Sequence, residues 1–177
     1  MPLETPVGRV VATELKPSTP HQFHFWTARE SEVGIGAIVR VDAPNRTVFG
    51  IVTDGFAYSD LMTPMHDVIG ADGDPSLAGF TPTERAEIRL YLAAVLRQVP
   101  EEPLQPVPLG EVRLAGDDDV VAALRMDAFM TGDNPTGVPM GVYAAAGREA
   151  PIYLDADFLL GPEAAHLSIT GVSGLAT

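Results

Sequence analysis

The amino-acid sequence predicts a mainly β fold, a small barrel that carries one or two helical insertions. Four segments near the start are rich in Val, Ile, Phe and Trp, which suit a half-buried pleated sheet: residues 8–15, 21–28, 35–42 and 47–57. Proline, glycine and asparagine separate these segments at roughly ten-residue intervals. Short strands in such close succession are typical of a barrel or a sandwich. Further strands are expected at residues 110–115, 142–145, 151–155 and 166–170.

The longer helical insertion is predicted over residues 82–98. Thr81 to Glu84 has the form of a capping box, with Pro82 at the first helical position. Apolar side chains then recur at helical spacing, namely Ile88, Tyr91, Leu92, Val95, Leu96 and Val99. Pro100 ends the pattern because proline cannot continue a helix.

The shorter helix is predicted over residues 118–126. Three consecutive aspartates, Asp117 to Asp119, stand at its start, and carboxylates favour the positive N-terminal end of a helix dipole. The turn-rich stretch 131–139 that follows is expected to be a loop.

The balance of charge argues against nucleic-acid binding by this chain. Its 24 acidic and 11 basic residues give a formal net charge of −13, and Lys16 is the only lysine. Neutralising phosphates requires clustered lysine and arginine, so this surface should repel DNA on average. The chain contains no cysteine, which excludes disulfides and thiolate metal sites. With no signal peptide and no long apolar run, we expect a cytoplasmic protein.

No metal site is predicted. On a strand His21 and His24 point to opposite faces, and the aspartate clusters lack the spacing of a calcium loop. The aromatic residues of the same strand are more informative. Phe23 and Phe25 share one face, which is expected to be core, and Trp26 takes the other. An outward tryptophan is typical of interfaces, so Trp26 is a candidate interface residue.

The end of the sequence holds the candidate cofactor-binding residues. An apolar run at 166–170 leads into Gly171, Val172, Ser173 and Gly174, and glycines after a strand let backbone N–H groups surround phosphates. Counting from Gly171, however, Ala176 stands where the second glycine of a P-loop belongs and Thr177 where its lysine belongs. Either the loop is a residue longer and its lysine lies past residue 177, or the glycines form a turn.

Several motifs together resemble the HerA-type P-loop ATPases. GRVV at residues 8–11, VGIGAIV at 33–39 and FGIVT at 49–53 are similar to the amino-terminal barrel, called the HAS domain, of HerA-type translocases and ATP synthase catalytic subunits. PIYLD at 151–155 and AHLSITG at 165–171 resemble the passage from that barrel into the ATPase core. Between residues 58 and 105 no motif resembles this family.

The resemblance implies four regions. Residues 1–57 would hold the first barrel strands, 58–104 an inserted loop and helix, 105–160 the remainder of the barrel, and 161–177 the start of an ATPase core cut within its phosphate loop. It also implies a parent that is a hexameric, ATP-driven DNA translocase or helicase in DNA end processing and repair. The parent would use ATP and Mg²⁺ and contact DNA through the core.

In such a parent the barrel would form a non-catalytic ring collar that docks a NurA-like nuclease. Gly171, Ser173 and Gly174 match the start of the phosphate loop, and the lysine, the magnesium-binding hydroxyl and the Walker B acid match nothing in this chain. One alternative is the barrel of another HerA- or FtsK-like motor, in defence or DNA packaging, with a different partner. Another is a stand-alone acidic β-domain enzyme, which would need paired carboxylates in a pocket.

Overall fold

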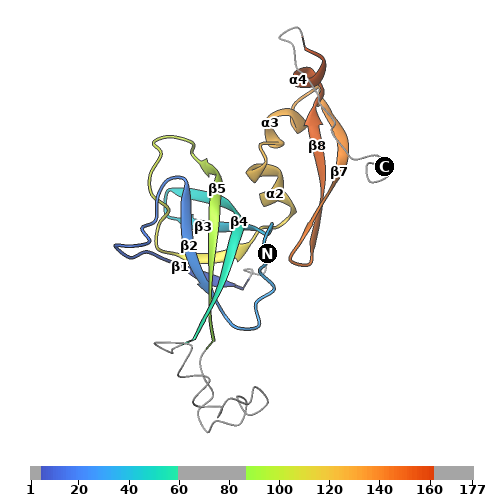
Figure 1. Cartoon of the computed structure of the whole chain (residues 1–177). Helices are drawn as coiled ribbons and strands as arrows, with labels where there is room; N and C mark the ends of the chain where they lie inside the picture. Colours follow the sequence, from blue (N-terminus) through green and yellow to red (C-terminus); the bar gives the residue numbers. More distant parts are fainter. Residues whose placement is uncertain (1–4, 60–86, 162–177) are drawn as a thin grey trace.

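Six strands close into a barrel in the computed structural model, which describes residues 5–59 and 87–161 (Figure 1). The strands are β1 (Gly8–Val11), β2 (Gln22–Thr27), β3 (Ile38–Ala43), β4 (Arg46–Ser59), β5 (Glu87–Val99) and β6 (Glu111–Leu114). Their order around the barrel is β1-β2-β5-β4-β3-β6, and β6 closes it by pairing with β1. The predicted mainly β barrel is therefore confirmed, as are its first four strands and the strand near residue 110.

The helix predicted over residues 82–98 is wrong where the structure describes it. Glu87–Val99 is a strand that pairs with β2 along one edge and with β4 along the other. Two flanking ladders satisfy its backbone, and this tertiary pairing outweighs the helical spacing of its apolar residues. The capping residues 81–84 lie outside the described residues. The stretch assigned to an insertion thus supplies a strand to the middle of the barrel.

Phenylalanines of β2 and valines of the other strands fill the barrel. Phe23 and Phe25 are fully buried, with ring centroids 5.9 Å apart, and Phe25 stacks on Tyr91 of β5 at 5.5 Å. The valines around them are Val10, Val39, Val41, Val48, Val52 and Val112. Phe23 and Phe25 share the inner face of β2 and Trp26 lies on the outer face, as the alternation predicts.

A second unit, made of short helices and a β-hairpin, follows the barrel in the chain. It comprises α2 (Asp117–Ala123), α3 (Asp127–Met130), β7 (Gly137–Ala145), β8 (Arg148–Asp155) and α4 (Ala156–Leu160). The short helix predicted at 118–126 is present but stops early, and Arg125 takes a positive φ of 59° before α3 begins. β7 begins inside the predicted loop 131–139. Because β7 and β8 form their own two-stranded sheet, only β6 of residues 105–160 belongs to the barrel.

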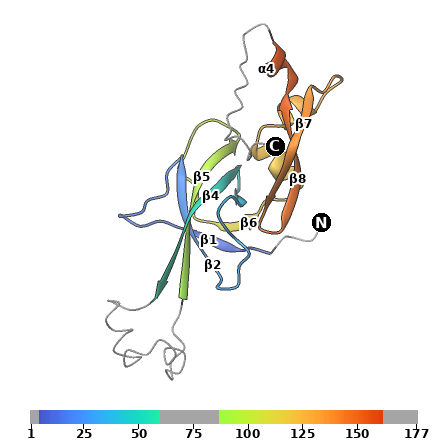
Figure 2. The ribbon, with the colours of Figure 1, turned by 45° about the vertical axis from the view of Figure 1, so that its right-hand side comes forward.

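A second apolar core fixes this unit to the outside of the barrel (Figure 2). Its buried members come from both parts, namely Ile38, Phe49, Ala115, Val120, Ala123, Met126 and Ala150. Tyr143 of β7 adds polar contacts. The backbone N–H of Ile38 donates to its hydroxyl at 2.7 Å, and the hydroxyl donates to the carbonyl of Gly36 at 3.2 Å. The hairpin is therefore held against the barrel by packing and by hydrogen bonds.

Two arginines of the barrel bind the helices. Arg97 of β5 donates to the carbonyl oxygen of Ala122 at 2.8 Å and to the carboxylate of Asp127 at 2.7 Å. Arg97 lies opposite Phe49, which packs in the second core. Residues directly opposite each other point to the same side of a sheet, so both residues meet the α2–α3 segment.

Arg40 makes the other link. Its guanidinium binds Asp42 of its own strand and Asp119 of α2, each at 2.8 Å. Asp119 also accepts the backbone N–H of Gly116 at 3.2 Å, completing the start of α2. The predicted aspartate cluster therefore begins the helix and joins it to the barrel.

Among residues 5–59 and 87–161, no helix is long and apolar enough to cross a membrane.

Gly50 lies where a side chain has no room, which gives a physical reason for the glycine in the FGIVT motif. A Cβ there would stand 2.8 Å from a ring carbon of the buried Phe23 and 3.1 Å from the carbonyl oxygen of Ala94. We expect Gly50→Ala to lower the free energy of unfolding by about 1–3 kcal/mol, because the ring has no space to move. Gly141→Ala is the matched control, since nothing lies within 4 Å of a Cβ there. Equal urea midpoints for the two variants would contradict this packing.

Candidate functional site: an aromatic face on the barrel

Five apolar side chains gather on the outer face of the three neighbouring strands β2, β5 and β4. They are Trp26, Phe56, Tyr58, Ile88 and Leu90, and we call them the aromatic face. Trp26 lies opposite Leu90, Leu90 opposite Phe56, and Ile88 opposite Tyr58. Residues directly opposite each other across strands point to the same side of a sheet, so the five form one continuous surface.

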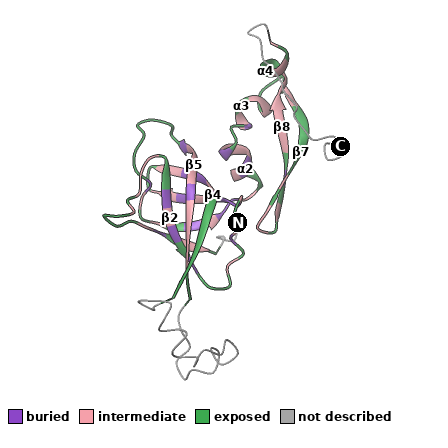
Figure 3. Ribbon diagram, viewed as in Figure 1, coloured by how far each residue is buried: buried purple, intermediate pink, exposed green. Residues whose placement is uncertain are grey.

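The aromatic face is open to solvent although its side chains are large and apolar. The exposed fractions are 46% for Trp26, 48% for Ile88, 43% for Tyr58 and 37% for Phe56. The second half of β4 is exposed throughout, and Figure 3 shows this part of the strand in green below the buried middle of the barrel. A contiguous aromatic patch of this kind marks an interaction site more often than a scattered exposed leucine does.

Lys16 holds the two rings of β4 in place. Its ammonium lies 5.3 Å from the centroid of Phe56 and 5.5 Å from that of Tyr58, and it donates to the Tyr58 hydroxyl at 3.2 Å. The two rings are tilted, with centroids 6.3 Å apart. Cation–π attraction and the hydrogen bond stabilise the orientation of the two rings. The only lysine of the chain is therefore part of this face.

Two further polar residues border the aromatic face. Arg9 of β1 lies directly opposite Trp26 in the sheet and is exposed. His24 occupies the next outward position of β2, and its buried Nδ1 has no hydrogen-bond partner. Burial and, to a lesser extent, the charge of Lys16 lower the pKa of His24, so the imidazole stays neutral near pH 7.

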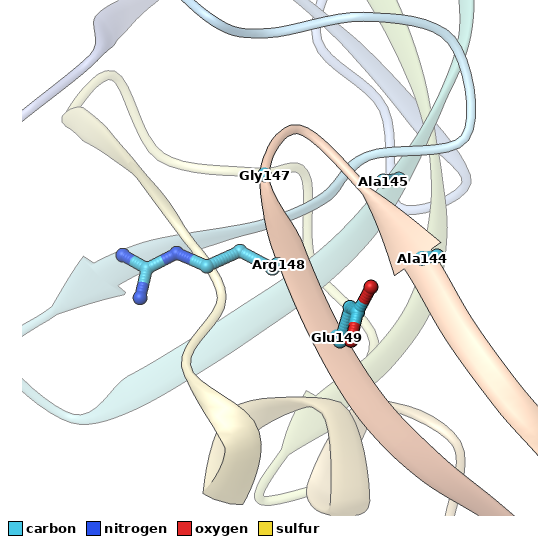
Figure 4. Close-up of a pocket in the computed structure, with 5 residues that line it drawn as sticks. All are labelled: Ala144, Ala145, Gly147, Arg148 and Glu149. Atoms are coloured by element: carbon cyan, nitrogen blue, oxygen red, sulfur yellow. The ribbon is translucent and has the colours of Figure 1, made fainter.

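Two hollows lie elsewhere on the described part of the chain. The larger, about 490 Å³, lies beside the turn between β7 and β8 and is lined by Ala144, Ala145, Gly147, Arg148 and Glu149. Figure 4 shows the side chains of Arg148 and Glu149 pointing in different directions there. The smaller, about 330 Å³, lies between the start of the chain and residues 28–32, and its polar lining residues are Glu30, Ser31 and Glu32.

The titratable groups of residues 5–59 and 87–161 give no indication of a catalytic acid or a metal site. A hydrogen bond from Arg89 lowers the pKa of Glu87, and one from Arg125 lowers that of Glu101. Both carboxylates thus favour the charged state, whereas a general acid needs a raised pKa. No group of three or more His, Asp or Glu side chains in this part of the chain is arranged to hold a metal ion. His21 precedes β2 and is exposed, whereas His24 lies within β2 and is half-buried.

The candidate residues from the sequence fall into two groups. Trp26 lies at the centre of the aromatic face, on the outward side of its strand as predicted. Gly171, Val172, Ser173 and Gly174 lie outside the described residues. The sequence analysis overlooked Phe56 and Tyr58, although their spacing of two on a predicted strand was a signal that they share a face. It also overlooked Ile88 and Leu90, because they were assigned to a helix.

No protein-family model matches this chain, and no curated protein matches it in sequence. Support for a function therefore comes from the geometry of the aromatic face and from the motifs that resemble the HerA-type ATPases.

Proposed function

We propose that this chain is the amino-terminal barrel of a HerA-type ATPase and that it serves as a protein-docking collar. The single observation that carries the proposal is the aromatic face on strands β2, β5 and β4. Tryptophan and tyrosine are enriched in the energetically dominant centres of protein interfaces. The rigid strands beneath them also lower the entropic cost of docking, because the aromatic side chains are already ordered.

The closed barrel is the fold that the HAS-domain resemblance implies, and this supports the assignment to a motor. In the proposed protein the partner is a NurA-like nuclease, and the parent is a cytoplasmic hexamer that acts in DNA end processing. ATP, Mg²⁺ and DNA are handled by the ATPase core, whose phosphate loop begins at Gly171, Val172, Ser173 and Gly174. The barrel takes no part in hydrolysis.

The experiment is a calorimetric titration of this chain with a NurA-like nuclease. The variant Trp26→Ala, Phe56→Ala should bind at least about 30-fold more weakly, since truncating an interface hot spot costs on the order of 2 kcal/mol. Val142→Ala is the control, because Val142 is an exposed apolar residue on β7, away from the aromatic face. Circular dichroism should show that both variants retain the β fold.

Each other result leads to a definite conclusion. Equal binding by both variants would show that the aromatic face is not the docking surface. A gene neighbourhood with a different effector, which binds in a Trp26-dependent way, would favour a defence or packaging motor over a nuclease-linked one. Turnover of a substrate by the purified chain would favour a stand-alone enzyme.

A further inference from the structure

Most arginines of the barrel and its helices already have carboxylate partners. Ion pairs between 2.6 and 3.2 Å neutralise five of them, namely Arg40, Arg89, Arg97, Arg113 and Arg125. Arg46 instead donates to the carbonyl oxygen of Pro106 and to Gln98. This leaves the question of where cations without a carboxylate partner lie on a chain of net charge −13.

Two such cations border the aromatic face. Within the described part of the chain, neither Arg9 nor Lys16 forms an ion pair with a carboxylate. Arg9 faces Trp26 across the β1–β2 pair, and Lys16 lies over Phe56 and Tyr58. Glu111 is the other cross-strand neighbour of Arg9, but its carboxylate binds Arg113 at 2.6 Å. We call Arg9 and Lys16 the cationic rim.

We propose that the partner docked on the aromatic face is a protein segment whose apolar anchor is flanked by aspartate or glutamate. This inference rests on the proposed docking function and specifies the chemistry of its partner. A protein that covers the aromatic face removes water from the cationic rim. Because a cation buried without a counter-charge costs several kcal/mol, the partner must bring carboxylates to Arg9 and Lys16.

The neighbouring charges favour a protein over single-stranded nucleic acid. Bases also stack on aromatic rings and phosphates also pair with cations, but Ile88 and Leu90 form the middle of this face and offer no ring for stacking. Asp54 lies opposite Leu92 in the adjacent row of outward side chains. This carboxylate, together with the overall charge, would repel a phosphate backbone. The neutral His24 adds no further positive charge.

The probe is a random peptide library displayed on phage and selected against the immobilised chain. Enriched peptides are then synthesised and titrated with the chain and its variants. We expect sequences in which Trp, Phe or Leu is flanked by Asp or Glu, and binding that Trp26→Ala abolishes. Lys16→Glu should weaken binding at least tenfold. Arg125→Glu changes the net charge equally at a distance from the face, and it should leave binding within twofold.

The outcomes separate this inference from the docking proposal. Trp26-dependent peptides without acidic residues, bound equally by Lys16→Glu, would overturn the inference and leave the docking function standing. If no peptide depends on Trp26 and the nuclease titration is equally insensitive to it, the docking function itself fails. If a labelled oligothymidine binds the chain and the Trp26→Ala variant does not bind it, the ligand of the aromatic face is single-stranded DNA and not an acidic protein segment.

Discussion

Replacing Phe25 with alanine is expected to lower the free energy of unfolding by about 3–5 kcal/mol. The ring is fully buried, stacks on Tyr91 at 5.5 Å and lies 5.9 Å from the ring of Phe23. Its removal leaves a cavity between strands β2 and β5 that the closed barrel has little freedom to collapse. Since small domains are stable by about 5–15 kcal/mol, the variant should lose a large part of its stability.

Trp26→Ala is the matched control for this measurement. Trp26 is the next residue of the same strand and has a larger side chain, but it points to solvent. Urea unfolding followed by circular dichroism should show a loss below about 1 kcal/mol for Trp26→Ala, as for most exposed sites. A tryptophan variant as unstable as the phenylalanine variant would mean that the aromatic face is structural and not a free surface.

Met126→Ala is expected to cost about 2–5 kcal/mol, the range for truncating a buried long apolar side chain. Met126 is buried in the second core between the barrel, α2 and β8, and its sulfur accepts the backbone N–H of Tyr153 at 3.3 Å. Because residues of the barrel and of the hairpin share this core, the whole described chain should unfold in one transition. Both the loss and the single transition are read from one urea titration.

Met140→Ala provides the comparison, because Met140 is exposed on β7. It should change the midpoint little. Two separate transitions in the Met126→Ala variant, with the barrel transition unchanged, would show that the helices and the hairpin are an independent unit.

The fold class followed from local pattern because most barrel strands obey a simple alternation. β2 is the clearest case, since Phe23 and Phe25 point inward and their neighbours outward. The short helix was predictable for a different reason, as its three aspartates lie in its first turn. In each case a local preference agrees with the tertiary structure.

β5 could not be predicted because it is apolar on both sides. Tyr91 and Ala93 face the barrel interior, whereas Ile88 and Leu90 form part of the aromatic face. Apolar residues on two faces break the period of two and create a spacing that also fits a helix. Leucine and alanine, which favour helices, strengthen that misreading. The outward residues that make the candidate interface are therefore the ones that misled the prediction.

The aromatic face could be predicted only in part for the same reason. Trp26 was recognisable from its own strand, but its neighbours come from β4 and β5, and their registers place them beside it. Register between strands distant in sequence is set by the packed structure and not by local pattern. The cationic rim is still harder to predict from the sequence, because identifying it requires knowing which arginines form ion pairs with carboxylates in the folded structure.

The closure of the barrel has a consequence for synthesis of the chain on the ribosome. β1 completes its pairing only with β6, where Gly8 meets Val112, so strands from opposite ends of the barrel sequence must meet before the sheet is closed. At translation speeds of about 5–20 residues per second, roughly 5–20 s pass between the synthesis of β1 and that of β6, and the edge of β1 stays unpaired during this time. Contacts of such long range also slow folding. During this interval the nascent chain displays an unpaired strand edge, which is a template for pairing with another chain.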